Sequence, residues 1–464
     1  MQTLRKNLYV IAIVLCLIIT TGVGICQTKE DAVAQTAWPK LTLKPDDRIL
    51  ILAPHPDDEL LGCAGIIQKA RAMGLPIHIV FLTYGDNNQW SFIIYRKHPV
   101  FFPKAMRQMG ILRHNEAIAS AKFLGVSPDN LTFLGYPDFG TLTIWYKHWG
   151  NKRPFLSMLT KVRAVPYFNA LRPGAPYKGE EILRDLTTVI REFRPTKIFL
   201  SHPGDHNGDH RALYLFTRVA LWNLASQMQP ELYPYMVHYK GWPMPRGYHP
   251  QKQLEPPPLF KEQISWQEDM LNSQEVSRKE KALRKQWSQY RSTPGYLKTF
   301  VRSSELFGDF PVVKLQSNIS SANLSTNSEQ ASEQLTDEER AFFVGFEERY
   351  AYIENDCLVI SIKLSRPLGK QVGIAVYIFG YRSDIPFVQM PKLQLRFGTF
   401  MHAIYDQNRR ISRSGIKIKR RMKEITIRVP LKLLGNPQRI LTSANTYLGN
   451  LPLDWVSWRI LELP

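Results

Sequence analysis

The stretch Ile49-Leu50-Ile51-Leu52-Ala53-Pro54-His55-Pro56-Asp57-Asp58-Glu59 decides the fold of this chain. Its first five residues form an apolar run with the length of a strand that is buried on both faces. Residues 59–73 then carry apolar side chains at helical spacing, and residues 77–82 form a second apolar run. A buried strand, a helix and another buried strand in this order predict a parallel sheet with a helical crossover.

The same alternation continues to about residue 312. The expected elements are a helix over 104–124, a strand over 131–134, a helix over 180–193, a strand over 197–200, a helix from about 209, an extended stretch over 236–242 and a charged helix over 278–290. Because such crossovers are right-handed, residues 40–312 are predicted to form a Rossmann-like α/β domain, with a doubly wound, mostly parallel sheet in a three-layer αβα sandwich. Ligands of this fold class lie beyond the carboxyl ends of the strands.

Three segments interrupt or follow this pattern. Residues 139–178 are rich in aromatics and prolines and are interpreted as an inserted rim, which covers either a site or a sheet edge. Residues 313–338 are rich in Ser, Asn, Gln and Glu and are expected to form a linker. Beyond them, runs that alternate polar and apolar residues predict an all-β sandwich over residues 339–464.

Two features of this C-terminal region carry further expectations. The basic run at residues 409–423 is expected to be a solvated hairpin. Residues 453–459 weakly resemble the final strand of carbohydrate-binding β-sandwich modules. In that strand Trp455 and Trp458 are three positions apart and are expected on opposite faces, so that at least one of them belongs to the core.

The composition excludes several classes of protein. With 464 residues, 44% of them hydrophobic and 22% charged, the chain is globular rather than disordered, collagen-like or polytopic in a membrane. Sixty Lys and Arg against 40 Asp and Glu give a formal charge of +20. This charge favours polyanions without naming one, and no specific nucleic-acid partner is expected. Outside the first 26 residues the cysteines are Cys63 and Cys357, which fall in different domains, so no disulfide framework is implied.

Residues 1–26 have the pattern of a targeting segment. A basic start is followed by 19 uncharged residues, from Leu8 to Cys26. The pattern predicts a cleaved export signal, and an uncleaved membrane anchor stays open because the run is just long enough to span a bilayer. Lipidation at Cys26 is a minority alternative. The protein is therefore expected to be exported to the periplasm, the cell envelope or the extracellular space.

Acidic and imidazole side chains gather where the first strand ends. His55, Asp57, Asp58 and Glu59 fall within five positions at the point where a doubly wound sheet opens its crevice. Clustered carboxylates repel one another unless a cation or hydrogen bonds offset their charge, which favours a metal site. His55 and Asp58 can converge on one ion while Asp57 projects elsewhere. A helix cap is the alternative for an isolated motif of this kind.

A second cluster follows the strand over 197–200. The segment Ser201-His202-Pro203-Gly204-Asp205-His206-Asn207-Gly208-Asp209-His210-Arg211-Ala212 supplies three histidines. One of them would complete a site of two histidines and one carboxylate with an open position, the arrangement of catalytic zinc. Zinc lowers the pKa of a water toward about 7 and polarises a carbonyl, and Asp57 is placed to accept the proton. The residues thus predict metal-assisted hydrolysis.

These two segments resemble the PIG-L/LmbE-like family of zinc-dependent N-acetylglucosaminyl deacetylases, and the resemblance covers about residues 46–300. Residues 54–59 look like the family's Pro-His-Pro-Asp-Asp-Glu signature. Residues 203–212 look like its Pro-x-Asp-x-(His/Asn)-x-Asp-His-Arg-Ala element.

The resemblance, carried over position by position, implies a role for each residue of the site. The implied zinc ligands are His55, Asp58 and His210. The implied general base is Asp57. Arg113, in the expected helix over 104–124, matches an Arg that contacts substrate, and Asp138 matches an acidic residue at a strand end that we also expect to contact substrate.

The sequence departs from the family pattern at one position. Many members carry a His three positions before the last zinc ligand, thought to steady the oxyanion and assist the leaving amine, and Asn207 stands there. An Asn donates a hydrogen bond but supplies no proton. His206 or His202 can take that role, and Asp209 is expected to orient a neighbouring histidine or the surroundings of the ion.

The predicted function is that of a zinc-dependent hydrolase. It removes the N-acetyl group from an N-acetylglucosamine-type amino sugar or glycoconjugate by a metal-activated water. The alternatives are a zinc amidase for a different amide and an exported glycan-binding protein without turnover.

Overall fold

The computed structural model describes residues 38–87, 102–315, 322–324, 335–398, 402–407, 409–412 and 415–464. The expected leader, residues 1–26, lies outside these ranges. Within them, no helix combines the length and the hydropathy that a bilayer crossing requires.

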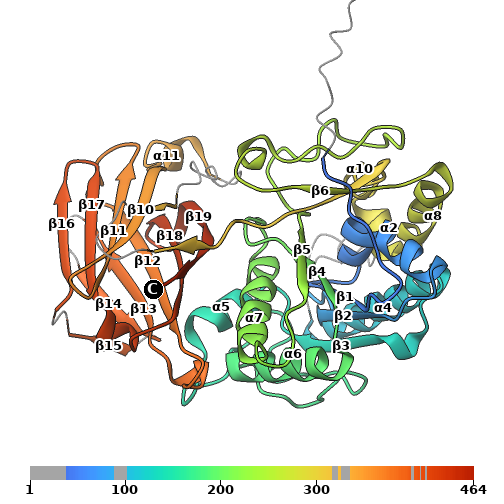
Figure 1. Ribbon diagram of the computed structural model, residues 1–464, viewed down its shortest axis with the longest axis horizontal. Helices are drawn as coiled ribbons and strands as arrows, with labels where there is room; N and C mark the ends of the chain where they lie inside the picture. The colour runs from blue at the N-terminus through green and yellow to red at the C-terminus, as the bar shows by residue number, and fades with distance from the viewer. Residues whose placement is uncertain are drawn as a thin grey trace, which may run out of the picture. The chain divides into compact units, whose positions relative to one another are not determined.

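A five-stranded parallel sheet forms the centre of the N-terminal α/β region (Figure 1). Its strands, in spatial order, are β3 (Leu131–Tyr136), β2 (Ile77–Thr83), β1 (Ile49–Ala53), β4 (Lys197–Ser201) and β5 (Glu231–Tyr235). Every residue of β1 and β4 is buried, as strands with helices on both sides require. The predicted doubly wound α/β fold is confirmed.

Helices cover both faces of this sheet. Figure 1 shows α2 (Asp58–Ala72) and α4 (Pro103–Phe123) on one face, and α6 (Gly179–Phe193) and α7 (Gly208–Asn223) on the other. The chain runs from β1 outward through β2 to β3 and then crosses to β4, on the other side of β1. This reversal opens a crevice beyond the carboxyl ends of β1 and β4, which is where the two sequence motifs lie.

Two expected elements differ in their bounds. In place of one helix over 278–290 there are α8 (Ser273–Leu283) and α9 (Trp287–Ser292), and α8 begins early because Asn272 and Glu275 form a capping box. The expected extended stretch over 236–242 is a loop, because the pairing of β5 with β4 ends at Tyr235. The α/β region also contains α5 (Thr141–Lys147), α10 (Pro294–Thr299) and the antiparallel pair β6 (Gln267–Met270) and β7 (Ser304–Phe307).

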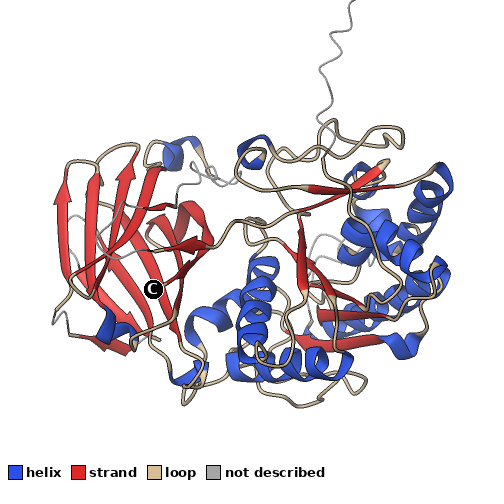
Figure 2. Ribbon diagram, viewed as in Figure 1, coloured by secondary structure: helices blue, strands red, loops and turns tan. Residues whose placement is uncertain are grey.

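Two sheets, antiparallel except for one short strand, form the C-terminal region (Figure 2). One has the order β16 (Lys417–Arg421), β17 (Glu424–Pro430), β11 (Cys357–Leu364), β10 (Phe346–Glu354), β9 (Ala322–Asn323). The other has the order β15 (Arg409–Ile411), β14 (His402–Asp406), β13 (Lys392–Phe397), β12 (Val372–Tyr381), β18 (Arg439–Leu448), β19 (Leu451–Glu462), β8 (Val313–Lys314). Ile360, Val376 and Ile427 are among the apolar side chains that the two sheets bury between them. The region is all β, as predicted.

Part of the expected linker, residues 313–338, joins the two sheets, while residues 316–321 and 325–334 lie outside the described residues. β8 and β9 come from residues 313–338 and pair with the two sheets, and Leu324 is buried in the core between them. The basic run is divided between the sheets: β15 pairs with β14 in one sheet, and β16 forms an exposed hairpin with β17 in the other. Its outward lysines, Lys417 and Lys419, are exposed.

Trp455 and Trp458 lie on the same face of β19, so the expectation that they would face opposite sides is wrong. Thr442 pairs with Arg459 and Ala444 pairs with Val456, so β19 has one residue more than β18 in this interval. This β-bulge shifts the alternation of side chains by one position. As a result both tryptophans face the α/β region, where Trp455 meets Arg211 and Trp458 meets Trp145.

Aromatic residues of α5, within the inserted segment 139–178, pack against the C-terminal region. Trp145 on α5 is fully buried, and its ring lies 5.6 Å from Phe379 and 5.4 Å from Phe387, between ring centroids. Tyr146 stacks on Tyr377 at 4.4 Å. The segment is predicted to cover either a site or a sheet edge. Trp145 covers neighbouring structure.

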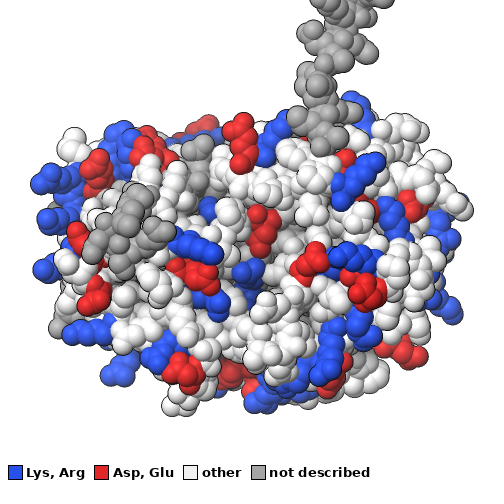
Figure 3. All heavy atoms as spheres, viewed as in Figure 1, with Lys and Arg blue, Asp and Glu red and all other residues white. Residues whose placement is uncertain are grey.

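Charged side chains are scattered over the face seen in Figure 3. Lys and Arg lie among Asp and Glu across this face rather than in one basic patch. The formal charge of +20 is therefore not concentrated on this side of the molecule.

Candidate metal centre and active site

The first motif forms a tight turn between β1 and α2. β1 ends at Ala53, and α2 begins at Asp58 with Asp57 as its N-cap residue. Asp57 has a φ of 121°, a region that residues with a side chain rarely occupy. The Asp57 carbonyl accepts hydrogen bonds from the backbone N–H groups of Leu60 and Leu61, at 3.0 Å each, and these hold the turn. Strain of this kind concentrates at functional sites.

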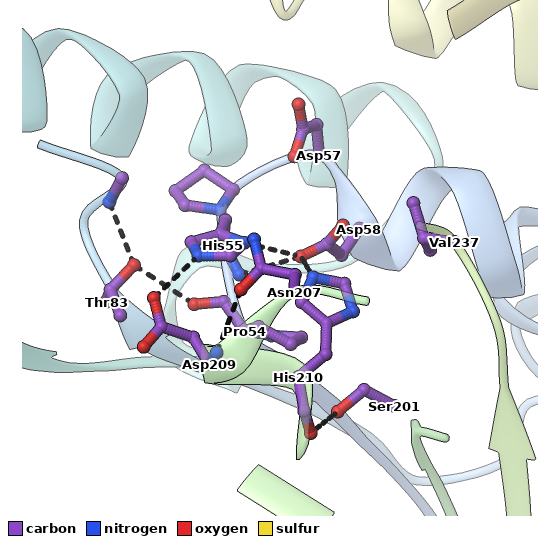
Figure 4. A network of polar contacts seen from close by, with 12 residues as sticks. Pro54, His55, Asp57, Asp58, Thr83, Ser201, Asn207, Asp209, His210 and Val237 are labelled. Atoms are coloured by element: carbon purple, nitrogen blue, oxygen red, sulfur yellow. Dashed lines mark hydrogen bonds and ion pairs between the residues drawn. The ribbon is translucent and has the colours of Figure 1, made fainter. Parts of the chain in front are cut away.

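The second motif begins α7 next to this turn. β4 ends at Ser201, whose Oγ donates a 2.7 Å hydrogen bond to the carbonyl of His210 in the first turn of α7. Asn207 is the N-cap, and its Oδ1 accepts from the N–H of Asp209 at 2.8 Å. These contacts direct the His210 ring toward Asp58 (Figure 4).

Three side chains from the two motifs share one small volume. One ligand atom from each of His55, Asp58 and His210 lies within 4.8 Å of the others, and all three residues are buried. Asp58 Oδ2 is 3.0 Å from His55 Nδ1 and 3.1 Å from His210 Nε2. His210 Nε2 is nevertheless buried without a hydrogen bond. A cation between these atoms would satisfy them together, so the donor set fits a metal ion with two nitrogen ligands and one oxygen ligand.

Carboxylates stand behind both histidines. His55 Nε2 is 3.1 Å from Asp138 Oδ1 and 3.2 Å from Asp209 Oδ2. On the other side, His210 Nδ1 is 3.2 Å from Asp205 Oδ2. A carboxylate on the far nitrogen fixes the tautomer of a metal-binding histidine and leaves the near nitrogen free to bind the ion.

The charges of this cluster shift the pKa values of its members. Burial would lower the pKa of His210, but Asp205 and Asp58 raise it to about 9. Burial would also raise the pKa of Asp58, but His210 and His55 hold it well below its usual range. Protons on the two imidazoles therefore balance the carboxylates when no ion is bound, and a metal must displace them.

Asp57 points away from the three ligands (Figure 4). Arg113 on α4 holds it in place. Arg113 Nη2 is 3.3 Å from Asp57 Oδ1 and donates a 2.6 Å hydrogen bond to the Pro56 carbonyl. Arg113 Nη1 donates to the Gly85 carbonyl at 2.9 Å. Burial raises the pKa of Asp57 to about 7, although Arg113 opposes the rise. A carboxyl with such a pKa can take and return a proton at neutral pH.

A cavity of about 170 Å³ opens over these residues. Its walls include His55, Asp57, Asp58, Arg113, Asp138 and Asn207. Substrate contact by Arg113 and by Asp138 stays a prediction. Asp138 accepts a 2.9 Å hydrogen bond from the N–H of Asn87 and faces His55, and these contacts position His55.

Asp209 lies beside a histidine, His55, as we expect from the sequence. It also fixes a loop. Its carboxylate accepts from the N–H of Phe139 at 2.5 Å, and from the N–H and Oγ1 of Thr141 at 3.0 and 2.5 Å. These bonds attach the segment after β3 to the start of α7. Asp209 is therefore a positioning residue that acts through His55.

The two histidines expected to replace the missing family histidine do not line this cavity. His202 is buried against Phe310 and Trp266, and its Nδ1 accepts from the N–H of Gly204. Burial lowers the pKa of His202 to about 3. His206 faces a different cavity, which borders the C-terminal region. His206 is not among the residues that line the metal-site cavity, so a catalytic role for it stays a prediction.

Residues 50–221 match the PIG-L family, described as GlcNAc-PI de-N-acetylase. The chain carries a PIG-L family domain. The match runs from β1 into α7, so it contains both sequence motifs and stops before β5.

Relatives of the PIG-L domain are named as deacetylases. A 1D-myo-inositol 2-acetamido-2-deoxy-α-D-glucopyranoside deacetylase of Kribbella flavida is 27% identical over 217 residues, which are 44% of this chain and 61% of that protein, less than two thirds of its length. A probable N-acetyl-α-D-glucosaminyl L-malate deacetylase 2 of Bacillus anthracis is 24% identical over 173 residues, 36% of this chain and 71% of that protein. Among solved structures, the N,N'-diacetylchitobiose deacetylase of Pyrococcus horikoshii is 20% identical, with 56% of this chain and 82% of that chain covered and a TM-score of 0.34.

Sequence reasoning missed two residues next to the PIG-L motifs. Asp205, the partner of His210, also accepts from the N–H groups of Val237 and His238, at 3.0 and 2.8 Å. The His238 ring lies 4.8 Å from the His210 ring and lines the cavity, and its Nδ1 is 3.0 Å from the hydroxyl of Tyr296. The sequence offered a signal for Asp205, because this carboxylate lies among the histidines of the second motif. His238 gave no signal, because the sequence predicts an extended stretch over 236–242, whereas the structure has a loop after β5.

Proposed function

We propose that this protein is a zinc-dependent hydrolase that removes the N-acetyl group from an N-acetylglucosamine-type sugar or glycoconjugate. The observation that carries the proposal is the convergence of His55, Asp58 and His210 beside the raised-pKa carboxyl of Asp57. The PIG-L domain and the deacetylase names of its relatives support the choice of reaction and of sugar.

His55, Asp58 and His210 are the proposed zinc ligands. When bound, zinc supplies a positive charge that polarises an amide carbonyl and makes a water more acidic. Asp138 and Asp209 behind His55, and Asp205 behind His210, keep the two imidazoles oriented for that task.

Asp57 is the proposed general base. It accepts a proton from the attacking water, and Arg113 keeps its carboxylate at the mouth of the cavity. Asn207 supplies no proton, and neither His202 nor His206 lines the cavity. The Asp57 carboxyl, protonated after the first step, is then the group that passes a proton to the leaving nitrogen, so that the amine and acetate are released.

Export is part of the proposal. The basic and then uncharged pattern of residues 1–26 supports a secretion signal or a membrane anchor. An enzyme at the cell envelope would act on glycans or glycoconjugates found there.

The test is acetate release from N-acetylglucosamine, its short oligomers and an N-acetylglucosaminyl lipid conjugate by purified, zinc-loaded protein. We expect about one zinc per chain and acetate release that Asp57→Asn lowers by about 10²–10⁴-fold without lowering zinc content. The matched control is Asp185→Asn, a buried carboxylate on α6 that pairs with Arg172 away from the cavity and should leave turnover nearly unchanged.

Other outcomes would select the alternatives. Turnover of a different amide with none of these sugars would make the protein another zinc amidase. A chain without stoichiometric zinc that binds glycans equally well with Asp57→Asn would be a binding protein, and the hydrolase would be refuted.

A further inference from the structure

A second cavity lies between the PIG-L domain and the C-terminal sheet that contains β18 and β19. Its volume is about 650 Å³, within the range of roughly 300–1,000 Å³ that is usual for pockets that hold small molecules. We call it the interdomain cleft. His238 and Tyr296 line both this cleft and the metal-site cavity, so the two spaces adjoin.

The walls of the interdomain cleft are cationic. Arg211, Lys240 and Arg246 line it, and its lining contains no Asp or Glu. No carboxylate among the described residues forms an ion pair with these three cations, and Arg246 has a Tyr296 ring 5.6 Å from its guanidinium carbon. Unpaired cations that share a concave wall attract an anion strongly, because the low-dielectric walls concentrate their field.

The cleft also offers surfaces suited to sugars. Trp455 presents its ring there, held by Arg211 at 4.0 Å from the ring centroid and by the edge of His206 at 5.5 Å. Aromatic rings stack on the apolar faces of pyranoses, and Asn445 beside Trp455 provides an amide that donates and accepts hydrogen bonds. His206 Nε2 is buried without a hydrogen-bond partner and can bond to a ligand.

We propose that the interdomain cleft is a substrate subsite for an anionic saccharide. The N-acetylated sugar occupies the metal-site cavity, and the sugar units attached to it extend into the cleft. There a carboxylate or phosphate on the saccharide contacts Lys240 and Arg246, and one ring stacks on Trp455. This inference rests on the proposed deacetylase function and names the class of substrate.

The C-terminal region therefore helps to select the substrate. Trp455 lies opposite Asn445 on the face of β19 that lines the cleft, and Ser443 to Asn445 on β18 form the neighbouring wall. A saccharide is favoured over a nucleic acid because the cleft is of small-molecule size and leads to a site that fits the acetamido group of a sugar.

The test measures binding in the Asp57→Asn background, in which turnover is blocked. The probes are the neutral tetramer of N-acetylglucosamine, a tetrasaccharide that alternates N-acetylglucosamine with glucuronic acid, and an N-acetylglucosaminyl disaccharide with a phosphomonoester. By calorimetric titration at low salt, we expect at least one anionic probe to bind about tenfold more tightly than the neutral tetramer. A comparison of the glucuronic acid probe with the phosphomonoester probe shows whether the cleft prefers a carboxylate or a phosphate. Added salt should reduce the advantage, because screening weakens charge pairing.

Variants assign the effect to the cleft. Lys240→Gln with Arg246→Gln should abolish the preference for the anion, and Trp455→Ala should weaken neutral and anionic probes alike. Lys417→Gln with Lys419→Gln on β16 is the matched control, since it removes the same charge from the exposed face of the other sheet. Arg246→Gln alone, at an exposed side chain, keeps the test valid if the double variant does not fold.

Each outcome decides between the two proposals. Equal binding of neutral and anionic probes, or a double variant that keeps the preference, overturns the subsite. Equally tight binding of a short single-stranded DNA, lost in the same variants, would make the cleft a general polyanion site and also overturns it. If the active protein releases acetate from no probe while anion-selective binding persists, the deacetylase is refuted and the cleft stands as a saccharide-binding site.

Discussion

The substitution Asp205→Asn tests the prediction that Asp205 orients His210 for metal binding. Asp205 is fully buried, and its Oδ2 accepts from two backbone N–H groups and faces Nδ1 of His210 at 3.2 Å. An Asn at this position keeps the size of the side chain but loses its charge. Its neutral amide oxygen accepts a hydrogen bond more weakly than a carboxylate, so the proton on His210 Nδ1, which leaves Nε2 free for the metal, is held less firmly.

The expected magnitude follows from this contact. Loss of a carboxylate behind a metal-binding histidine typically weakens metal affinity by about 10- to 100-fold, which corresponds to about 1.4–2.8 kcal/mol. The two backbone bonds to a charged acceptor also weaken, which lowers the free energy of unfolding by about 1–2 kcal/mol. We therefore expect the loss in the free energy of zinc binding to exceed the loss in the free energy of unfolding.

The assay is competition for zinc between the protein and a chromogenic chelator, together with urea unfolding of the same samples. Asp185→Asn is the control, because it removes a buried carboxylate from an ion pair distant from the cavity. The reasoning is refuted if Asp205→Asn binds zinc as tightly as the parent protein, or if Asp185→Asn weakens zinc binding equally.

Two further predictions concern stability. Burial raises the pKa of Asp269 from 3.8 to about 7, with Glu305 adding to the rise and Lys69 opposing it. Between pH 4 and 7 the Asp269 carboxyl is therefore protonated in the folded state and ionised in the unfolded state. Its contribution to the free energy of unfolding is complete below pH 4 and declines as the pH rises to 7. Asp269→Asn should thus gain up to about 4 kcal/mol in unfolding free energy relative to the parent from pH 4 to 7; a pH-independent difference in urea unfolding would contradict this. Trp145→Ala should cost about 3–5 kcal/mol and split one urea transition into two, because its ring joins the two regions; an unchanged single transition would contradict this.

The sequence indicated the architecture of the α/β region because its signals are local. Apolar runs such as Ile49–Ala53 and the helical spacing that follows them reflect burial on both faces of a strand and on one face of a helix. Strand ends in a doubly wound sheet meet at one edge, so His55 and His210 were placed near each other without coordinates. The bounds of α8 and β5 were missed because capping and strand pairing depend on neighbours that periodicity does not report.

The site was predictable where chemistry lies within a motif and unpredictable where it depends on packing. His238 reaches the cavity because β5 ends at Tyr235 and the loop after it brings the His238 ring to 4.8 Å from the His210 ring, between ring centroids. Asn207 and Asp209 were expected near the chemistry, but whether a carboxylate binds an ion, caps a helix or fixes a loop is decided by what lies within 3 Å of it.

The sequence by itself determined the fold class, the two histidine and aspartate motifs and their meeting at one sheet edge. Those properties follow from side-chain chemistry and short-range periodicity. Only the tertiary structure decided which carboxylates lie beside His55 and His210, and that a one-residue bulge puts Trp455 and Trp458 on the same face of β19. These features depend on the register and packing of segments far apart in the chain, and no local pattern of residues encodes them.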